Sequence, residues 1–478
     1  MQSISTSIGR IFLLPSIATS ILAASAFADE CPDEERCTKV FSCHPGHDGV
    51  LEGGPIFLPR SDSAPGFQPG DWNVETLQST GPSNNRLDLV LVCDGYTTAN
   101  IANFAPRAAA SIEELFDYEP FTSYRPYFNI HRVDVISSES GVDNDPSQGI
   151  NRNTALDMAF WCSGIERLLC VNVGKAKMAA QLAPDVDQIF AVANSTKYGG
   201  AGYSNDDIGT FSSNNEGSLQ VAIHELGHSL GNLADEYDYG GSEVWNGGEP
   251  SRENVSIYEE EEMEAQNRKW HAWLGYNQPI LGVHSTFEGA NYSTFGIYRP
   301  TNNSMMKELY QPFNMPSREY LIIEIQKVVN HLDSWLPAGS NAPWGSTLSV
   351  SCVEPLHGLT YQWYRNNSII NSAKSNTLDL STLPLVKPGD TIEVVITDET
   401  TMVRNEAARN DWMRESHAWS VSEPTNPDPD FNNDGQVNGA DLGILLLNFG
   451  TNNSAIDLNG DGMVDGGDIG QLLAAWTG

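Results

Sequence analysis

The sequence predicts a multidomain protein in which an α/β domain is followed by a small β-sandwich and then by a small α-helical domain. Three observations lead to this prediction. Between residues 81 and 338, apolar runs typical of buried strands alternate with helical stretches. Residues 340–422 instead alternate polar and apolar positions between closely spaced turns. Residues 430–478 contain the same acidic loop pattern twice.

Residues 1–28 have the pattern of a secretory signal peptide. Arg10 supplies positive charge, residues 11–24 are largely apolar, and Ala26-Phe27-Ala28 is a small-x-small cleavage site. A membrane anchor is the alternative, but the run is short and contains Pro15, and no later run could span a bilayer. We therefore expect a secreted protein, extracellular or associated with a cell surface, with no transmembrane anchor in the mature chain.

Residues 29–80 are rich in Gly, Pro and Asp, which predicts an irregular, cysteine-containing segment or a short propeptide. In an exported chain disulfides are plausible, and the odd total of seven cysteines leaves at least one unpaired within the chain. Cys162 and Cys170 flank a short segment and could pair, whereas Cys93 and Cys352 lie in strand-like runs. Three further cysteines lie near the N-terminus, at Cys31, Cys37 and Cys43. Their spacing of six residues is not typical of metal ligands.

The α/β domain is expected to contain four strands and three helices. The strands are predicted within 87–96, 128–136, 167–172 and 188–193, and the helices within 101–118, 217–231 and 318–336. A glycine-rich stretch at 198–203 precedes the second helix. It is either a flexible loop or a strand edge that lets a substrate backbone approach closely.

The helix at 217–231 carries His224-Glu225-Leu226-Gly227-His228. Because positions i and i+4 share one helix face, His224 and His228 could bind one Zn²⁺. Glu225 could then reach a metal-bound water and act as the general base. The alternative is an amphipathic helix with two surface histidines. Asn214, Asn215 and Glu216 favour a helix start just before this motif.

A third zinc ligand is expected soon after the helix, once Gly231 or Asn232 turns the chain. The pattern is similar to that of metzincins, in which a glycine follows the second histidine and a further ligand comes three residues later. Ala234 occupies that position and cannot bind zinc. Asp235, three residues beyond Asn232, is the preferred ligand, and Glu236 is the alternative.

A second metzincin-like feature lies downstream, at residues 299–306. Met305 and Met306 follow turn-forming residues there, which resembles the methionine turn beneath a metzincin zinc site. The alternative is that both are ordinary core residues. Tyr237 and Tyr298 are candidates for stabilising an oxyanion by donating a hydrogen bond.

The predicted sandwich has strand-like segments at 346–352, 361–364 and 391–396. Cys352 and Trp363 resemble an immunoglobulin-like core, although no second cysteine follows to complete the disulfide of that family. Residues 423–429 are rich in proline and are expected to be a linker.

The duplicated acidic loops have the spacing of calcium-binding loops, and an acidic disordered tail is the alternative. Gly435 and Gly462 stand at loop position 6, where the chain must turn sharply. We expect one structural Ca²⁺ in each loop. The residues at positions 1, 3, 5, 7, 9 and 12 are Asp430, Asn432, Asp434, Gln436, Asn438 and Asp441, and then Asp457, Asn459, Asp461, Met463, Asp465 and Asp468.

The formal net charge of −36 argues against binding nucleic acid through its phosphates and favours cations instead. The acidic cluster at 259–264 is expected to be a solvated face.

From about residue 84 to residue 336, the chain resembles the IgA-peptidase family of secreted bacterial metallopeptidases. The resemblance implies a zinc-dependent endopeptidase that acts on protein or peptide substrates, with an α/β fold split by an active-site cleft. It does not imply cleavage of immunoglobulin A. The matching stretches are residues 94–97, 138–142, 167–170, 198–200, 224–237 and 298–306.

Residues 430–478 look like a type I dockerin, which implies a cohesin-like partner. Loop positions 10 and 11 are Gly439-Ala440 and Gly466-Gly467, without the hydroxyl pair of typical dockerins. A cell-envelope partner is therefore the alternative.

Together these patterns predict a secreted zinc endopeptidase attached to a surface or scaffold. The alternative is a non-catalytic adhesion protein with a structural zinc site. A fourth protein ligand would favour that alternative, because catalytic zinc keeps one position open. His271 and His284 are the nearby histidines, and neither has a spacing that predicts ligation.

Overall fold

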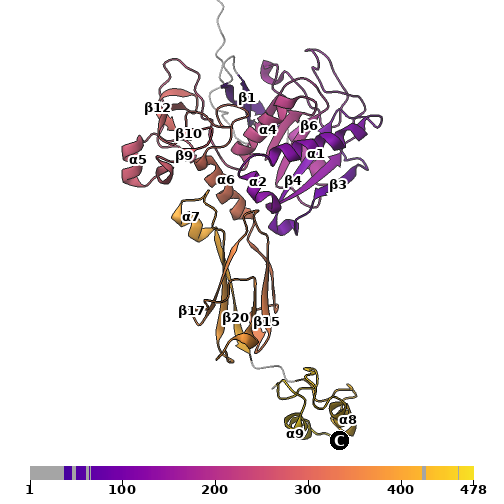
Figure 1. The fold of residues 1–478 in the computed structure, drawn as a ribbon. Helices are drawn as coiled ribbons and strands as arrows, with labels where there is room; N and C mark the ends of the chain where they lie inside the picture. Colours follow the sequence, from indigo (N-terminus) through magenta and orange to yellow (C-terminus); the bar gives the residue numbers. More distant parts are fainter. Residues whose placement is uncertain (1–36, 46–49, 61–63, 65, 423–426, 461) are drawn as a thin grey trace, which may run out of the picture.

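The computed structural model describes residues 37–45, 50–60, 64, 66–422, 427–460 and 462–478 (Figure 1). The predicted signal peptide, Cys31, Asp461 and the first four residues of the predicted linker lie outside the described residues. None of the described helices is long and apolar enough to cross a membrane.

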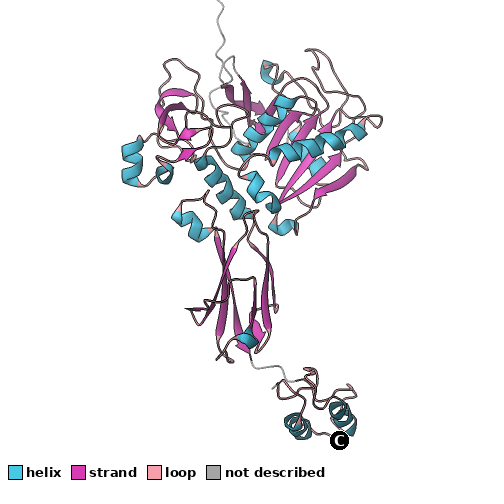
Figure 2. Ribbon diagram, viewed as in Figure 1, coloured by secondary structure: helices cyan, strands magenta, loops and turns pink. Residues whose placement is uncertain are grey.

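The first domain is built on an eight-stranded sheet with the order β2-β1-β7-β8-β6-β4-β5-β3 (Figure 2). The inner strands β8, β6, β4 and β5 are parallel to one another, and every pairing that involves an outer strand is antiparallel. Every residue of β4 is buried, which explains its continuous apolar run. The strands are β1 Cys37–Pro45, β2 Leu51–Pro59, β3 Asn73–Gln78, β4 Leu87–Asp94, β5 Phe128–Asp134, β6 Gln188–Ala193, β7 Gly200–Tyr203 and β8 Ile208–Ser212.

The N-terminal prediction of an irregular segment is wrong for the described residues. β1 and β2 form a hairpin on one side of the sheet, and β3 pairs with β5 at the opposite edge. The partners of β1 and β3 outside the hairpin lie far along the chain, so local glycine and proline content did not reveal them. The glycine-rich stretch at 198–203 is likewise mostly strand β7 and not a flexible loop.

The helices of this domain are α1 Phe104–Leu115, α2 Phe121–Tyr124, α3 Val173–Ala180, α4 Glu216–Ser229, α5 Glu260–Gln266 and α6 Met315–Val328. Figure 1 shows α4 between the main sheet and a smaller group of elements that includes α5. That group contains short strands β9 Asn277–Gln278, β10 Gly282–Val283, β11 Phe287–Ala290 and β12 Ser293–Arg299.

Two predicted elements differ from the structure. Residues 167–172 make only isolated bridges, from Leu168 to Gly200 at the start of β7 and from Cys170 to Ala159 in a loop, and so do not form a strand. The helix predicted to reach residue 336 ends at Val328, and residues 332–336 form strand β13 of the next domain, paired with β15. Among the cysteines, Cys162 and Cys170 form a disulfide, and Cys93 and Cys352 are free thiols.

The second domain is a β-sandwich with its own core, in which Trp363 and Trp419 stack with ring centroids 5.8 Å apart. It contacts the first domain through buried Asp398, whose carboxylate accepts hydrogen bonds from the hydroxyl of Tyr124 at 2.6 Å and from Nε2 of His357 at 2.7 Å. One sheet contains β13 Leu332–Leu336, β15 Thr347–Cys352 and β18 Thr377–Asp379; the other contains β14 Asn341–Pro343, β16 Thr360–Arg365, β17 Ser368–Ile369, β19 Thr391–Thr397 and β20 Arg414–Ser422.

The C-terminal part has two helices, α8 Gly439–Leu447 and α9 Gly466–Ala474, around a small apolar core. Each helix begins with a capping box, formed by Asn438 with Asp441 and by Asp465 with Asp468. The model therefore has the predicted multidomain, mixed α/β organisation.

Candidate active site

Helix α4 brings the two motif histidines together. The side chain of Asn215 caps the helix by accepting a hydrogen bond from the Gly217 backbone at 3.1 Å. His224 and His228 lie one turn apart, and their Nε2 atoms are 3.1 Å from each other. The chain then reverses at Asn232, which has a left-handed φ of 45°.

Asp235 completes a cluster with the two histidines. Its Oδ1 lies 3.1 Å from Nε2 of His224 and 3.3 Å from Nε2 of His228. One ligand atom from each residue lies within 4.8 Å of the others, and all three side chains are buried. Burial alone would raise the pKa of Asp235, but His228 and His224 hold that pKa well below its ordinary value. Asp235 is therefore an anion beside two imidazoles.

Glu236, the alternative ligand, lies elsewhere. Its carboxylate accepts hydrogen bonds from Ser304 Oγ at 2.7 Å, from Asn254 Nδ2 at 2.9 Å and from Asn314 Nδ2 at 2.9 Å. Burial raises the pKa of Glu236, although these hydrogen bonds oppose the increase. The side chain thus anchors the turn below the cluster. The sequence analysis did not identify its three partners, which lie 18 to 78 residues away.

The orientation of both histidine rings is set by backbone carbonyls. Nδ1 of His224 donates to the carbonyl of Met305 at 2.9 Å, and Nδ1 of His228 donates to the carbonyl of Leu233 at 2.7 Å. Because a carbonyl can only accept, each ring carries a proton on Nδ1 in these contacts. Both Nε2 atoms then present lone pairs to one point, as in metal-binding histidines.

The residues of the predicted methionine turn lie beneath this cluster. Met305 and Met306 are fully buried, and Met305 supplies the carbonyl that orients His224. Met306 packs against α4 so closely that a Cβ added at Gly227 would lie 2.7 Å from its Sδ. A residue larger than glycine at this position would require the Met306 side chain to move.

Glu225 lies on the β7 side of α4, beside Gly202. It is 1 % exposed, and a Cβ added at Gly202 would lie 2.0 Å from Oε2 of Glu225. Gly202 does not have a left-handed φ, so its function is to make space and not to allow a special turn. The glycine-rich strand β7 therefore leaves the space that the Glu225 carboxylate occupies.

We expect Gly202→Ala to lower peptidase activity at least tenfold without loss of bound metal, because the new methyl group displaces Glu225 and leaves the metal-binding atoms in place. Metal content by mass spectrometry and peptide cleavage rates check this. Gly209→Ala is the matched control, since its nearest neighbour is a Phe190 ring carbon at 3.3 Å. Equal activity in the two variants would contradict the prediction.

The two predicted oxyanion tyrosines have different surroundings. Tyr298 donates to Oε1 of Glu259 at 2.9 Å. Tyr237 is buried, and its ring packs edge-on against Tyr292, with centroids 5.6 Å apart. Tyr292 reaches the cluster, where its hydroxyl donates a hydrogen bond to Oδ2 of Asp235.

Tyr292 was not predicted because no motif surrounds it. The turn between β11 and β12 is held beside Asp235 by backbone hydrogen bonds, from Asn291 to Asp235 at 2.9 Å and from Tyr292 to Tyr237 at 3.1 Å. These contacts join segments more than fifty residues apart. His271 and His284 do not join the cluster, so among the described residues no fourth ligand accompanies the three.

The two C-terminal loops share one hydrogen-bonding pattern. In the first, Asp430 Oδ2 accepts from Gly435 N at 2.8 Å and Asp441 Oδ1 accepts from Asn432 N at 3.2 Å. In the second, Asp457 Oδ2 accepts from Gly462 N at 2.8 Å and Asp468 Oδ1 accepts from Asn459 N at 3.0 Å. Gly435 and Gly462 have φ of 84° and 96°, conformations that favour glycine. Met463 is half exposed, and Asn432, Asp434 and Gln436 lie within the first loop.

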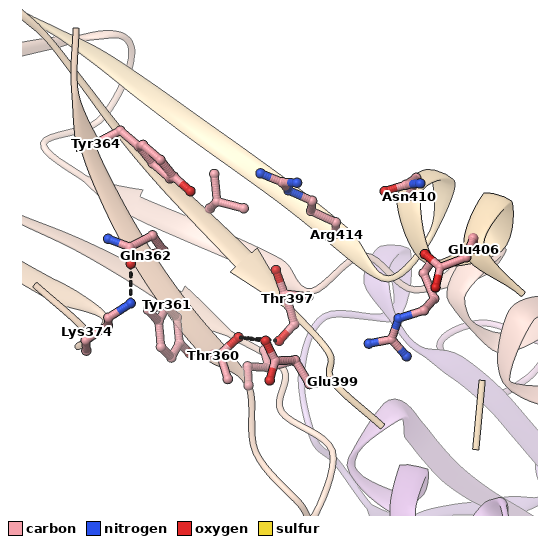
Figure 3. Close-up of a pocket in the computed structure, with 13 residues that line it drawn as sticks. Thr360, Tyr361, Gln362, Tyr364, Lys374, Thr397, Glu399, Glu406, Asn410 and Arg414 are labelled. Atoms are coloured by element: carbon pink, nitrogen blue, oxygen red, sulfur yellow. Dashed lines mark hydrogen bonds between the residues drawn. The ribbon is translucent and has the colours of Figure 1, made fainter. Parts of the chain in front are cut away.

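A separate hollow of about 700 Å³ lies on the sandwich, between the outer face of the β16–β19–β20 sheet and α7 Glu406–Asp411 (Figure 3). Its lining is mostly polar, and Lys374 donates a hydrogen bond to Gln362 at its edge. None of the predicted site residues lines it.

Residues 75–285 match the model of a peptidase family described as IgA Peptidase M64. The match covers less than half of the 478 residues and includes His224, Glu225, His228 and Asp235. It supports the predicted family and a hydrolase that acts on protein or peptide substrates. No curated protein matches the chain.

Proposed function

We propose that the protein is a secreted zinc-dependent endopeptidase. The observation that carries this proposal is the convergence of His224, His228 and Asp235 beside Glu225. Two imidazole nitrogens and one carboxylate oxygen are a donor set that zinc accepts in catalytic sites, where three protein ligands leave a position for water. The backbone carbonyls that orient both rings are the outer partners that such ligands require.

In this proposal, bound zinc would supply an acidified water and polarise the scissile carbonyl. Glu225 would act as the general base, accepting a proton from the attacking water and delivering it to the leaving amine. Tyr292 holds Asp235 through its hydroxyl and is a positioning residue. Met305 and Met306 support the cluster from below without binding the metal.

We expect Tyr292→Phe to weaken zinc affinity by about 10–100-fold, the usual cost of losing an outer partner of a metal ligand. Competition with a chromogenic chelator measures this affinity. Tyr298→Phe is the control, because its hydroxyl bonds to Glu259. A larger effect at Tyr298 than at Tyr292 would reverse the assignment and restore Tyr298 as a site residue.

We further propose that the C-terminal loops bind two Ca²⁺ ions and attach the enzyme to a cohesin-like or cell-envelope partner. This proposal is supported by the matching carboxylate contacts in the two loops and by glycine with positive φ at both sharp turns. Asp461 completes the second ligand set in the sequence.

Removal of calcium from the full chain should therefore open residues 430–478 to proteolysis and leave the sandwich resistant. Limited digestion with and without EGTA, read by mass spectrometry, provides the measurement. Asp441→Ala with Asp468→Ala should reproduce the EGTA pattern in the presence of calcium. Identical digestion of the wild type under both conditions would rule out structural calcium.

The alternative function, an adhesion protein with structural zinc, is tested by incubating the protein with a pool of denatured proteins. New termini that appear with the wild type, disappear with a zinc chelator and are absent with Glu225→Ala support the peptidase. Bound zinc without cleavage, before and after removal of the hairpin described below, supports adhesion.

A further inference from the structure

The β1–β2 hairpin, described at residues 37–45 and 50–59, covers the candidate site. The ring of Phe41 on β1 stacks on the ring of His228, with centroids 4.2 Å apart and planes 16° from parallel. Nζ of Lys39 lies 4.7 Å from the centre of the same Phe41 ring. With the hairpin in place, His224, Glu225, His228 and Asp235 are 0 %, 1 %, 2 % and 0 % exposed. A polypeptide substrate cannot reach them in this arrangement.

The strand β1 lies where an extended substrate would be expected to bind. It runs antiparallel to β7, with Phe41 paired to Gly202, the glycine that adjoins Glu225. Addition of an extended segment to a sheet edge is a common mode of peptide binding, because backbone hydrogen bonds supply affinity for any sequence. The hairpin thus passes over both Glu225 and a histidine in the manner of a peptide.

The two strands of the hairpin pair mainly with each other. Its own strands pair over nine residues, whereas β1 and β7 share the single register pair at Phe41. On the other side of the site, Leu51 N donates to the carbonyl of Lys307 at 2.8 Å, next to a bridge between Val50 and Glu308. Further hydrogen bonds join Thr38 to Asp206 at 2.7 Å and Tyr239 to the carbonyl of Gly53.

The peptidase match is independent of the hairpin. It begins at residue 75, after both hairpin strands, and includes β7 and α4. Between the hairpin and β3, residues Gln68, Gly70 and Asp71 are exposed and have no helix or strand structure. A chain break at this point separates the hairpin covalently from the rest of the domain.

We propose that strand β1, held by its partner β2, is a built-in occupant of the substrate groove that keeps the enzyme latent, and that substrates bind as extended strands along β7 once the hairpin leaves. This inference rests on the proposed peptidase function. Release requires hydrolysis of one peptide bond between β2 and β3 by a protease, which consumes one water and yields a new carboxylate and a new amine.

The test uses the full chain with a site-specific protease sequence inserted between Gly70 and Asp71. A second version also carries Val50→Cys and Glu308→Cys, which can lock the hairpin across the bridge described above. We expect peptide cleavage to rise at least tenfold after the cut. After the cut, the version with the two added cysteines oxidised to a disulfide should cleave peptides as slowly as the uncut chain. Mild reduction of that disulfide should restore the faster cleavage. The cut chain without the added cysteines controls for the reductant.

A readout that needs neither zinc nor activity accompanies these rates. Carbethoxylation of His224 and His228 in the metal-free protein, read by mass spectrometry, should rise at least tenfold on release relative to His417. As a control, the same protease site is inserted at the sandwich turn around Leu385, which is 83 % exposed. Cutting there should change neither the rate of peptide cleavage nor the reactivity of the histidines. If circular dichroism shows that the cut chain loses its fold, Phe41→Ala in the uncut chain replaces it and should make His228 more reactive.

The outcomes separate the two proposals. Increased histidine reactivity together with increased cleavage supports latency. Increased reactivity in a protein that cleaves no substrate would overturn the peptidase and with it latency, while leaving the hairpin as the cover of the site. Unchanged reactivity and unchanged cleavage after a complete cut would show that the hairpin is a permanent edge of the sheet.

Discussion

Glu225→Gln should reduce kcat by about 10²–10⁴-fold, the contribution typical of a positioned general acid or base. The amide keeps the shape of the side chain, so the space beside Gly202 stays filled, but it cannot take a proton. Because Glu225 is not one of the three clustered metal-binding residues, bound zinc should remain near one per chain. Steady-state rates and metal content, measured on whichever form of the protein cleaves substrate, check both parts.

The outcome distinguishes chemistry from folding. Unfolding temperature should change little, since glutamine is nearly isosteric with glutamate. Retained activity in Glu225→Gln would reject this residue as the base, and loss of zinc together with activity would show that it supports the metal instead. Glu216→Gln, which removes a carboxylate from the exposed first turn of the same helix, controls for the loss of a charge on α4.

Asp235→Ala should cause the second large effect, loss of the metal. It leaves two imidazoles without the anion, so zinc affinity should fall by more than the roughly 10–100-fold expected for the outer partner Tyr292. Activity should fall in parallel and return in part at high zinc concentration. Chelator competition provides the affinities.

The matched control is Glu236→Gln, because it changes the adjacent acid, which bonds to Ser304, Asn254 and Asn314. We expect this variant to keep zinc and to lose part of its thermal stability, since glutamine must donate where the carboxylate only accepted. If Glu236→Gln loses zinc and Asp235→Ala keeps it, the ligand assignment is reversed.

The positions of Asp235 and Glu236 in the structure show why the sequence could not decide which of them is the third proposed zinc ligand. Both residues follow the turn after α4 and differ by one position, so spacing favoured Asp235 without excluding Glu236. The choice is made by Asn254, Ser304 and Asn314, which draw the Glu236 carboxylate into the interior, and by Tyr292, which holds Asp235 toward the histidines. These partners come from distant segments.

What the sequence determined by itself is local. His224, Glu225 and His228 occupy neighbouring positions because helical geometry places i and i+4 on one face, and alternating or continuous apolar runs predicted most inner strands. The tertiary structure alone decided the elements whose partners are remote. Residues 37–45 and 73–78 form strands that pair with the distant strands β7 and β5, and residues 332–336 pair with β15 and do not continue the predicted helix. Strand pairing is a contact between distant segments, so its energy is not encoded in the local pattern of either one.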